Sequence, residues 1–278
     1  MTSCRFVLLD VPVVVHSPSD EIINRVELCY SALPGHDAEL EDCVRVEVDP
    51  DHVGWEVRVT QRAAVGAADF LAAIRTLNHE LVHGLMLRRR ELFYVHAGMV
   101  VVDGEALILP GLSRAGKSTL VLALLQQGAE FLSDELLVFD PAEKRLLPFP
   151  RAIKVRDECV AYFPTLAEQF VGAGEGRFLP FDAIEDLRMA TSATPGHIAV
   201  PRWQAGNADS VVSLTRGQGL VQLTGSVLNF GSHGPASIDH LAELVGAVSC
   251  SSITWSDPHA AASLLLETMR RQRSQLPS

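Results

Sequence analysis

The sequence predicts a mixed α/β (α+β) fold, in which a mixed sheet with flanking helices follows a small β-rich section. Short β-rich runs separated by turns occupy residues 1–65, an apolar hairpin leads into a glycine-rich turn, and an apolar helix directly follows that turn. The chain has 278 residues and is 47% hydrophobic, which is enough for a sizeable core. We therefore expect a small β-rich section at 1–65 and a larger domain at 66–278.

The first elements are strands followed by one long helix. The runs "FVLLDVPVVVH", "CVRVEVD" and "WEVRVT" are rich in β-branched residues and are separated by the turn-forming stretches "SPSD", "LPGHD" and "DPDHVG". From Ala67 to about Arg90 the period changes to that of a helix. Its apolar stripe consists of Phe70, Ile74, Leu77, Leu81 and Leu85.

A hairpin and a helix enclose the glycine-rich turn. "MVVVDGEALIL" contains Asp103-Gly104, a pair that favours a tight hairpin turn because both central positions need positive φ. The hairpin leads the chain to Gly111, and "KSTLVLALLQQ" then predicts a buried helix that ends at Gly128. "EFLSDELLVFD" follows as a strand.

The last part of the chain alternates between strands and helices. "RLLPFPRAIKV" is expected to be extended, and residues 157–195 are too irregular for a prediction. "HIAVPRW", "SVVSL" and "SSITW" predict strands, and residues 216–230 and 237–247 predict helices. Ser256 or Asp257 can cap a final helix, with Pro258 in its first turn.

Composition disfavours several classes of protein. A net charge of -11, from 34 acidic and 23 basic residues, would repel a phosphate backbone or an anionic membrane. The five cysteines are scattered without Cys-x-x-Cys spacing, which predicts neither a disulfide framework nor a thiolate zinc site. Neither a secretory signal nor a long apolar run is present. We expect a cytoplasmic protein with neither nucleic acid nor membrane as partner.

Two motifs make incompatible claims about the chemistry. "NHELVHG" contains His79-Glu80-x-x-His83, the pattern with which many metallopeptidases hold zinc. Both histidines, however, fall on the helix face away from the apolar stripe. Met86 and Arg89 also stand where the extended pattern needs a glycine and a third histidine. A zinc metallopeptidase remains an alternative, with a solvent-facing helix surface as the simpler interpretation.

"GLSRAGKST" at 111–119 has the surroundings of a phosphate-binding P-loop. Its glycines permit a turn whose N–H groups surround phosphate oxygens, and the following helix presents its positive end to the same anion. Lys117 can reach the β- and γ-phosphates, and Ser118 can ligate Mg²⁺. The residues expected to bind nucleotide are Gly111, Ser113, Arg114, Ala115, Gly116, Lys117, Ser118 and Thr119.

Two carboxylates follow the loop after one helix and one reversal. Asp134 and Glu135 lie on a strand that can return beside the phosphates. Because neighbouring side chains on a strand point to opposite faces, both acids can serve one site only if the strand bends there. A solvated strand end is the alternative interpretation of the same spacing.

The stretch from His96 to Asp140, "HAGMVVVDGEALILPGLSRAGKSTLVLALLQQGAEFLSDELLVFD", resembles the core of the HPr kinase/phosphorylase family and its shorter relatives. "PFPRAIKV", "IAVPRW" and "SIDHLAELV" extend the resemblance over roughly residues 66 to 270. It implies a phosphoenolpyruvate-carboxykinase-like P-loop fold, ATP and Mg²⁺ as donor and cofactor, and transfer of the γ-phosphate to a serine hydroxyl. The ring-like assembly of that family allows a homo-oligomer here.

The resemblance also implies roles for individual residues. Asp134 would be the base that deprotonates the serine hydroxyl, with Lys117 on the phosphates and His96 orienting the acid. Ser118 and Glu135 would hold Mg²⁺. Arg114 stands where the family usually has glycine, and the glycine-rich stretch used for dephosphorylation is missing, so phosphorylase activity is not expected. We expect the acceptor to be a serine-bearing peptide, protein or small molecule. A nucleotide-binding regulatory protein without kinase activity is the main alternative.

Overall fold

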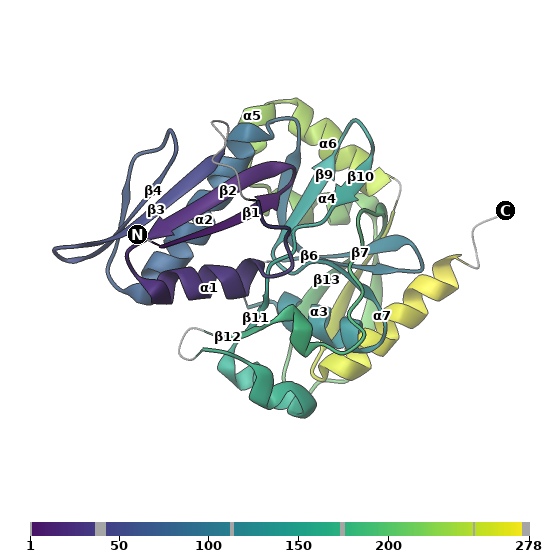
Figure 1. The fold of residues 1–278 in the computed structure, drawn as a ribbon. Coiled ribbons are helices and arrows are strands. Elements are labelled where there is room, and N and C mark those ends of the chain that lie inside the picture. Colours follow the sequence, from purple (N-terminus) through teal and green to yellow (C-terminus); the bar gives the residue numbers. More distant parts are fainter. Residues whose placement is uncertain (1, 37–42, 112–113, 173–175, 247, 274–278) are drawn as a thin grey trace. The chain divides into compact units, whose positions relative to one another are not determined.

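The structure is a computed structural model that describes residues 2–36, 43–111, 114–172, 176–246 and 248–273. The chain divides into two compact units, Met1–Arg90 and Glu91–Ser278. Each unit combines helices with a β-sheet, which confirms the mixed α+β class (Figure 1). The first unit includes the helix that follows residue 67, and the proposed division at residues 65 and 66 stays a prediction.

The first unit has a five-stranded sheet in the order β1-β2-β3-β4-β5. β2 and β3 run parallel, and the other neighbouring strands are antiparallel. Alternating valines on these strands are buried, as the β-branched runs of the sequence predicted. The strands are β1 (Thr2–Leu8), β2 (Val11–Ser17), β3 (Val44–Asp51), β4 (Gly54–Val59) and β5 (Val65–Ala67).

Two helices pack on this sheet, α1 (Asp20–Tyr30) and α2 (Phe70–Arg88). Of the stripe predicted for α2, Phe70 is half-buried and the other four residues are buried, and a side chain at Gly84 would collide with valines of β3 and β4. α1 was missed by the sequence analysis, which treated residues 1–65 as strands and turns. Parallel strands need a crossover between them, and α1 provides it between β2 and β3.

The second unit contains an eight-stranded mixed sheet in the order β10-β9-β6-β7-β13-β15-β14, with β8 also paired to β6. Its central strands β7, β13 and β15 are parallel to one another, so their carboxyl ends lie at the same edge. The strands are β6 (Phe93–Val102), β7 (Glu105–Pro110), β8 (Glu130–Ser133), β9 (Leu136–Asp140), β10 (Arg145–Leu147), β13 (Thr194–Trp203), β14 (Ser210–Leu214) and β15 (Ser249–Trp255).

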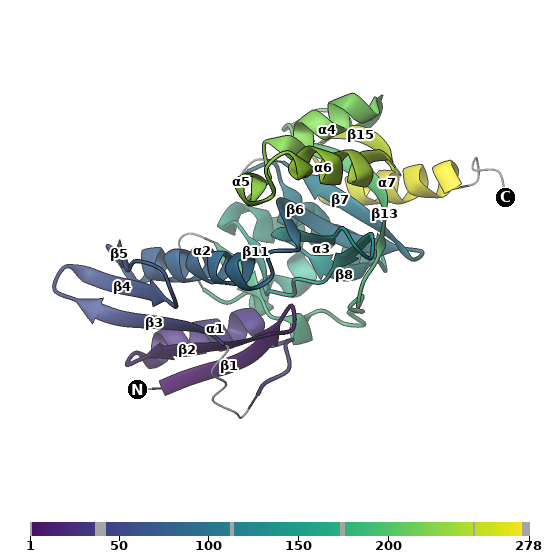
Figure 2. The same ribbon diagram turned by 90° about the horizontal axis from the view of Figure 1, so that it is seen from above.

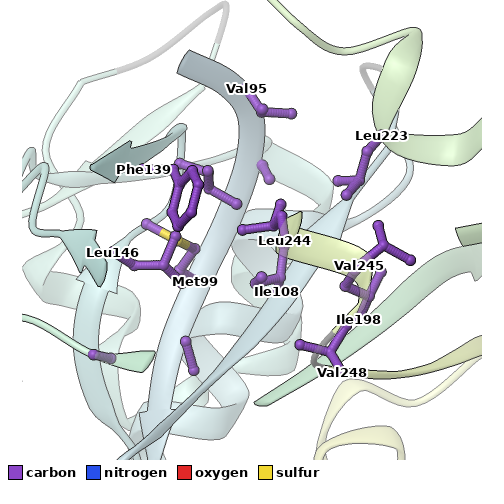
Figure 3. Close-up of a cluster of buried hydrophobic side chains, with 14 of the residues drawn as sticks. Val95, Met99, Ile108, Phe139, Leu146, Ile198, Leu223, Leu244, Val245 and Val248 are labelled. Carbon is purple, nitrogen blue, oxygen red and sulfur yellow. The ribbon is translucent and has the colours of Figure 1, made fainter. Parts of the chain in front are cut away.

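Helices cover both faces of this larger sheet (Figure 2). α3 (Lys117–Gln126) and α7 (Pro258–Arg273) pack together on one face. α4 (Arg216–Thr224) and α6 (Ala236–Gly246) pack together on the other, beside the short α5 (Phe230–His233). Under α4 and α6 lies a core of buried side chains from the sheet and both helices, which holds the strands that carry the candidate site (Figure 3).

Several predicted elements differ from those observed. Residues 130–140, expected to be one strand, form β8 and β9 with a break at Asp134 and Glu135. The helix expected over 216–230 ends at Thr224. Residues 157–195, left without a prediction, contain 3₁₀ helices at Asp157–Tyr162, Pro164–Gln169 and Phe181–Ala183, and the strand β12 (Arg177–Leu179), which pairs with β11 (Ile153–Val155). Within the described residues, the helices are all too short or too polar to span a membrane.

Candidate functional site

The glycine-rich turn lies between the buried strand β7 and the helix α3. The backbone enters the left-handed region at Gly111 (φ 148), Arg114 (φ 73) and Gly116 (φ 87). Arg114 was predicted to occupy a position where glycine is usual, and its positive φ explains why glycine would suit this position. Holding arginine in this region costs roughly 1 kcal/mol, which makes Arg114 a candidate for a functional contact.

Gly116 is the residue from which α3 starts, and it has no room for a side chain. A Cβ atom there would overlap the ring of Trp255, which is 1% exposed at the end of β15. The indole therefore packs directly against the turn, and the loop backbone lies close to the end of β15. This close approach and the positive φ together require glycine at this position.

Lys117 follows immediately and lines the cleft described below. Its Nζ donates a hydrogen bond to the carbonyl oxygen of Gly111 at 2.8 Å, so the side chain folds back over the turn. Burial lowers the pKa of Lys117, and the negative charges of Glu135 and Asp134 oppose that shift. A lysine affected by both carboxylates shows that the loop and the acid pair share one electrostatic environment.

Strand β6 brings His96 to the same place. Its antiparallel pairing with β7 sets Ala97 opposite Pro110, just before the turn, and its pairing with β9 sets His96 opposite Leu136, just after the acid pair. Burial lowers the pKa of His96, Lys117 lowers it further, and Glu135 opposes the change. The imidazole is therefore neutral at physiological pH and can accept a proton or a hydrogen bond.

A serine forms the corner that carries the two acids. The Oγ of the buried Ser133 accepts hydrogen bonds from the backbone N–H of Glu135 at 3.2 Å and of Leu136 at 2.9 Å. This side-chain turn interrupts the strand between β8 and β9. The break is the bend that both carboxylates need in order to reach one site.

Asp134 is a buried carboxylate with one oxygen left unsatisfied. The residue is 1% exposed, and its Oδ2 accepts a hydrogen bond from the backbone N–H of Lys154 at 3.3 Å. Its Oδ1 is buried and makes no hydrogen bond with any residue that the structure describes. Burial raises the pKa of Asp134 to about 6, although the positive charge of Arg151 opposes the shift. A hydrogen bond from the Ser118 side chain acts on the same carboxyl and partly opposes the rise in its pKa, and Oδ1 can still accept a bond from a bound ligand.

Glu135 is held in an ion pair. Its Oε2 lies 2.6 Å from Nη2 of Arg151, and its Oε1 lies 3.5 Å from Nδ1 of His96. Burial raises the pKa of Glu135, but Arg151, His96 and Lys117 outweigh it and keep the pKa below its usual value. The two adjacent acids therefore differ, because Glu135 is ionised at neutral pH while Asp134 titrates near it.

These side chains line one cleft of about 770 Å³. From the predicted set the structure brings together His96, Arg114, Gly116, Lys117, Ser118, Thr119, Asp134 and Glu135. Gly111 contributes through its carbonyl, and Ala115 packs so closely that a side chain at Gly111 would crowd its methyl group. Ser113 lies outside the described residues.

Part of the wall of this cleft was not predicted from the sequence. Residues 155–159, from β11 into the first 3₁₀ helix, form a wall that contains both charges and Cys159. Ser133 was not predicted either, although serine before two acids is a turn signal that could have located the strand break. No local sequence pattern indicates that Trp255 packs against the loop, because this contact depends on how the strands pair in the sheet.

The His-Glu-x-x-His sequence lies in the first unit on α2 and is built differently from a zinc site. Glu80 is buried and its Oε2 accepts a hydrogen bond from Nε of Arg62 at 2.5 Å, so it is not free to act as a base. The Nε2 atoms of His79 and His83 lie 3.2 Å apart. Within the described residues, no group of three or more His, Cys, Asp or Glu side chains could hold a metal ion.

Comparisons with known proteins give distant similarity to solved structures. No protein-family model and no curated protein matches the sequence. The solved Hpr(Ser) kinase/phosphatase from Coxiella burnetii aligns with 66% of this chain and 97% of its own, at 13% identity and a TM-score of 0.35. A score that low supports no conclusion about this chain, whose candidate function has to come from the site.

Proposed function

We propose that this chain is an ATP-dependent phosphotransferase that moves the γ-phosphate to a serine hydroxyl of a peptide, protein or small molecule. Its larger domain, proposed at 66–278, would have the phosphoenolpyruvate-carboxykinase-like P-loop arrangement of the HPr-kinase-related enzymes. The observation that carries the proposal is the buried Asp134, whose Oδ1 accepts no hydrogen bond from the residues that the structure describes, in a cleft shared with Lys117 and Ser118.

The loop provides the phosphate site. The backbone N–H groups around Gly116 and the positive end of α3 suit a phosphate chain, and the ammonium of Lys117 adds a charge. Lys117 now bonds the Gly111 carbonyl, and the proposal requires it to exchange that contact for phosphate oxygens. Arg114, which lines the cleft and has a positive φ, is a further candidate contact.

Asp134 is suited to take the proton of the incoming hydroxyl. With a pKa raised to about 6, it is ionised at pH 7.5 and is a better proton acceptor than an ordinary aspartate. As the proton moves to Oδ1, the hydroxyl oxygen bonds to the γ-phosphorus and the bond from that phosphorus to the ADP oxygen breaks. The products are a phosphoserine-type ester and ADP.

The residues present fit Mg²⁺. This ion needs one or two protein ligands besides phosphate oxygens and water, and Ser118 and the ionised Glu135 both line the cleft. When bound, Mg²⁺ would neutralise charge on the β- and γ-phosphates. Arg151 holds Glu135 in place, and His96 beside it orients the acid pair.

Purified protein with radiolabelled ATP and MgCl₂ tests the proposal. Serine-containing peptides and free serine are offered as acceptors, with matched alanine peptides as blanks. We expect transfer that chelation of Mg²⁺ abolishes. Lys117→Ala should lose ATP binding, Asp134→Asn should bind ATP without transfer, and Asp182→Asn, which changes an exposed aspartate of the same unit, should behave like the wild type.

ATP binding without any turnover, unchanged in Asp134→Asn, would identify a nucleotide-binding regulatory protein instead. Peptide cleavage that survives Lys117→Ala but is lost with zinc in His79→Ala would establish the metallopeptidase.

A further inference from the structure

A second pocket, of about 480 Å³, lies in the same unit as the cleft. It is lined at Glu105, His197 and Ser249, where the parallel strands β7, β13 and β15 begin. The phosphate loop follows the other end of β7, and Trp255 at the end of β15 supports that loop. The cleft and the second pocket therefore lie at opposite ends of the same three strands.

A hydrogen-bonded chain forms one wall of this pocket. Ser249 Oγ donates to Oε1 of Gln272 at 2.6 Å, and the two ring nitrogens of His197 lie 2.7 Å from Ser249 Oγ and 2.8 Å from Ser251 Oγ. Burial lowers the pKa of His197 to about 4, so the ring is neutral at pH 7. Since the Ser249 hydrogen goes to Gln272, His197 Nδ1 donates to Ser249 and Nε2 accepts from Ser251.

In that arrangement both ring nitrogens of His197 are hydrogen-bonded, and the amide NH₂ group of Gln272 remains available as a donor. The amide nitrogen of Gln272 donates to none of the residues that the structure describes, and Gln272 lines the pocket. His197 itself is 1% exposed and fully engaged, so its role is to fix the Ser249 and Gln272 side chains. The pocket thus presents a pre-oriented amide donor.

The charges around the pocket are unequal. Arg273 lies 3.6 Å from Asp103 and 3.5 Å from Glu105, so acidic groups already oppose its charge. Arg216 is exposed and has no acidic oxygen within 4.0 Å in the described part of the chain. It also begins α4, whose positive end adds to its charge.

The positive charge of Arg216 acts on a side chain that lines the pocket. Burial raises the pKa of the Cys250 thiol, and Arg216 opposes that shift. Val248 and Met269, both buried, give the same pocket an apolar wall. A guanidinium that forms no ion pair within the described residues, an oriented amide and an apolar wall together suit a molecule with an anionic group and a short carbon skeleton.

We propose that this pocket binds a small organic anion, with its carboxylate or phosphate group on Arg216 and the Gln272 amide and its carbon skeleton against Val248 and Met269. The site is separate from the phosphotransfer cleft, and the proposal does not depend on the phosphotransferase activity.

Calorimetric titration of the full chain with potassium citrate and with potassium phosphate, each against potassium chloride of equal ionic strength, tests this site. Lys117→Ala serves as the parent protein, because it removes the main anion contact of the loop. We expect saturable binding of at least one anion. Stronger binding of citrate would indicate a carboxylate ligand, and stronger binding of phosphate a phosphate ester.

Adding Arg216→Ala to this parent should weaken binding at least about tenfold, because a guanidinium–anion contact is lost. Arg216→Lys should weaken it less, and Gln272→Leu several-fold. Arg271→Ala, which removes an exposed arginine of α7 that pairs with Glu267, is the matched control and should have no effect. Melting curves check that each variant is folded. Absence of saturable binding in the parent, or equal losses in Arg216→Ala and Arg271→Ala, would overturn the proposal.

Discussion

Replacing Asp134 with asparagine should stabilise the larger unit while abolishing phosphotransfer. The carboxyl is buried, and its pKa rises from an ordinary 3.8 to about 6. The folded state therefore keeps a proton between these values that the unfolded chain has lost, so stability falls as pH rises through this window. Above about pH 6 the full cost of roughly 3 kcal/mol is present.

Asparagine avoids this cost because it carries no charge, and its carbonyl oxygen can still accept from the Lys154 N–H. Its new NH₂ group lacks an assured partner, which should take back about 1 kcal/mol. We expect a net gain of about 2 kcal/mol at pH 8, or roughly 4–8 °C in the melting temperature. At pH 4 the wild-type carboxyl is protonated in the folded state and the cost of the amide prevails, so Asp134→Asn should be less stable than the wild type by up to about 1 kcal/mol.

Scanning calorimetry of both proteins between pH 4 and pH 8, without nucleotide and Mg²⁺, measures this difference. The informative quantity is the stability of Asp134→Asn minus that of the wild type, because other titrating groups cancel in it. Asp182→Asn is the control for an exposed carboxylate of the same unit. A difference that stays flat with pH, or that is negative at pH 8, would refute the argument that burial strains this carboxylate.

Three further predictions concern the same unit. Gly116→Ala should destabilise it by about 2–4 kcal/mol and abolish ATP binding, since the methyl overlaps Trp255 at a positive φ; chemical unfolding and nucleotide titration measure both effects. Leu244→Ala should cost about 2–5 kcal/mol in urea unfolding because this core side chain is 1% exposed, whereas Ile238→Ala on the same helix, 46% exposed, should cost under about 0.5 kcal/mol. The rate of phosphotransfer should fall as pH drops through about 6, where Asp134 becomes protonated, and a pH-rate profile with saturating ATP shows the limb.

Local patterns were enough to predict the elements around the loop. The hairpin turn at Asp103 and Gly104 has positive φ at both residues, as their pairing required. The helix after the loop begins at Lys117 and ends near Gly128, whose φ is also positive. Each of these features depends on residues a few positions apart, which is why the sequence alone indicates them.

Other features depend on contacts between distant parts of the chain. α1 has buried residues at helical spacing, but it lies among β-rich runs whose pattern dominated the prediction. β12 is three residues long and exists through its pairing with β11. The second pocket joins Glu105, His197, Arg216, Ser249 and Gln272, which no local motif connects. The candidate cleft was easier to foresee because most of its chemistry lies between His96 and Glu135.

The indole beneath Gly116 gives this protein an internal optical probe. Of the three tryptophans, Trp203 is 47% exposed and Trp55 is half-buried, so their emission should respond to solvent quenchers, while Trp255 is 1% exposed beside the turn. Emission that resists quenching by acrylamide therefore arises mainly from Trp255, the tryptophan that packs against the loop. Any ligand that tightens or shifts the turn should change the emission wavelength or the fluorescence lifetime of Trp255. Ligand binding to the loop can therefore be followed in real time with unlabelled protein.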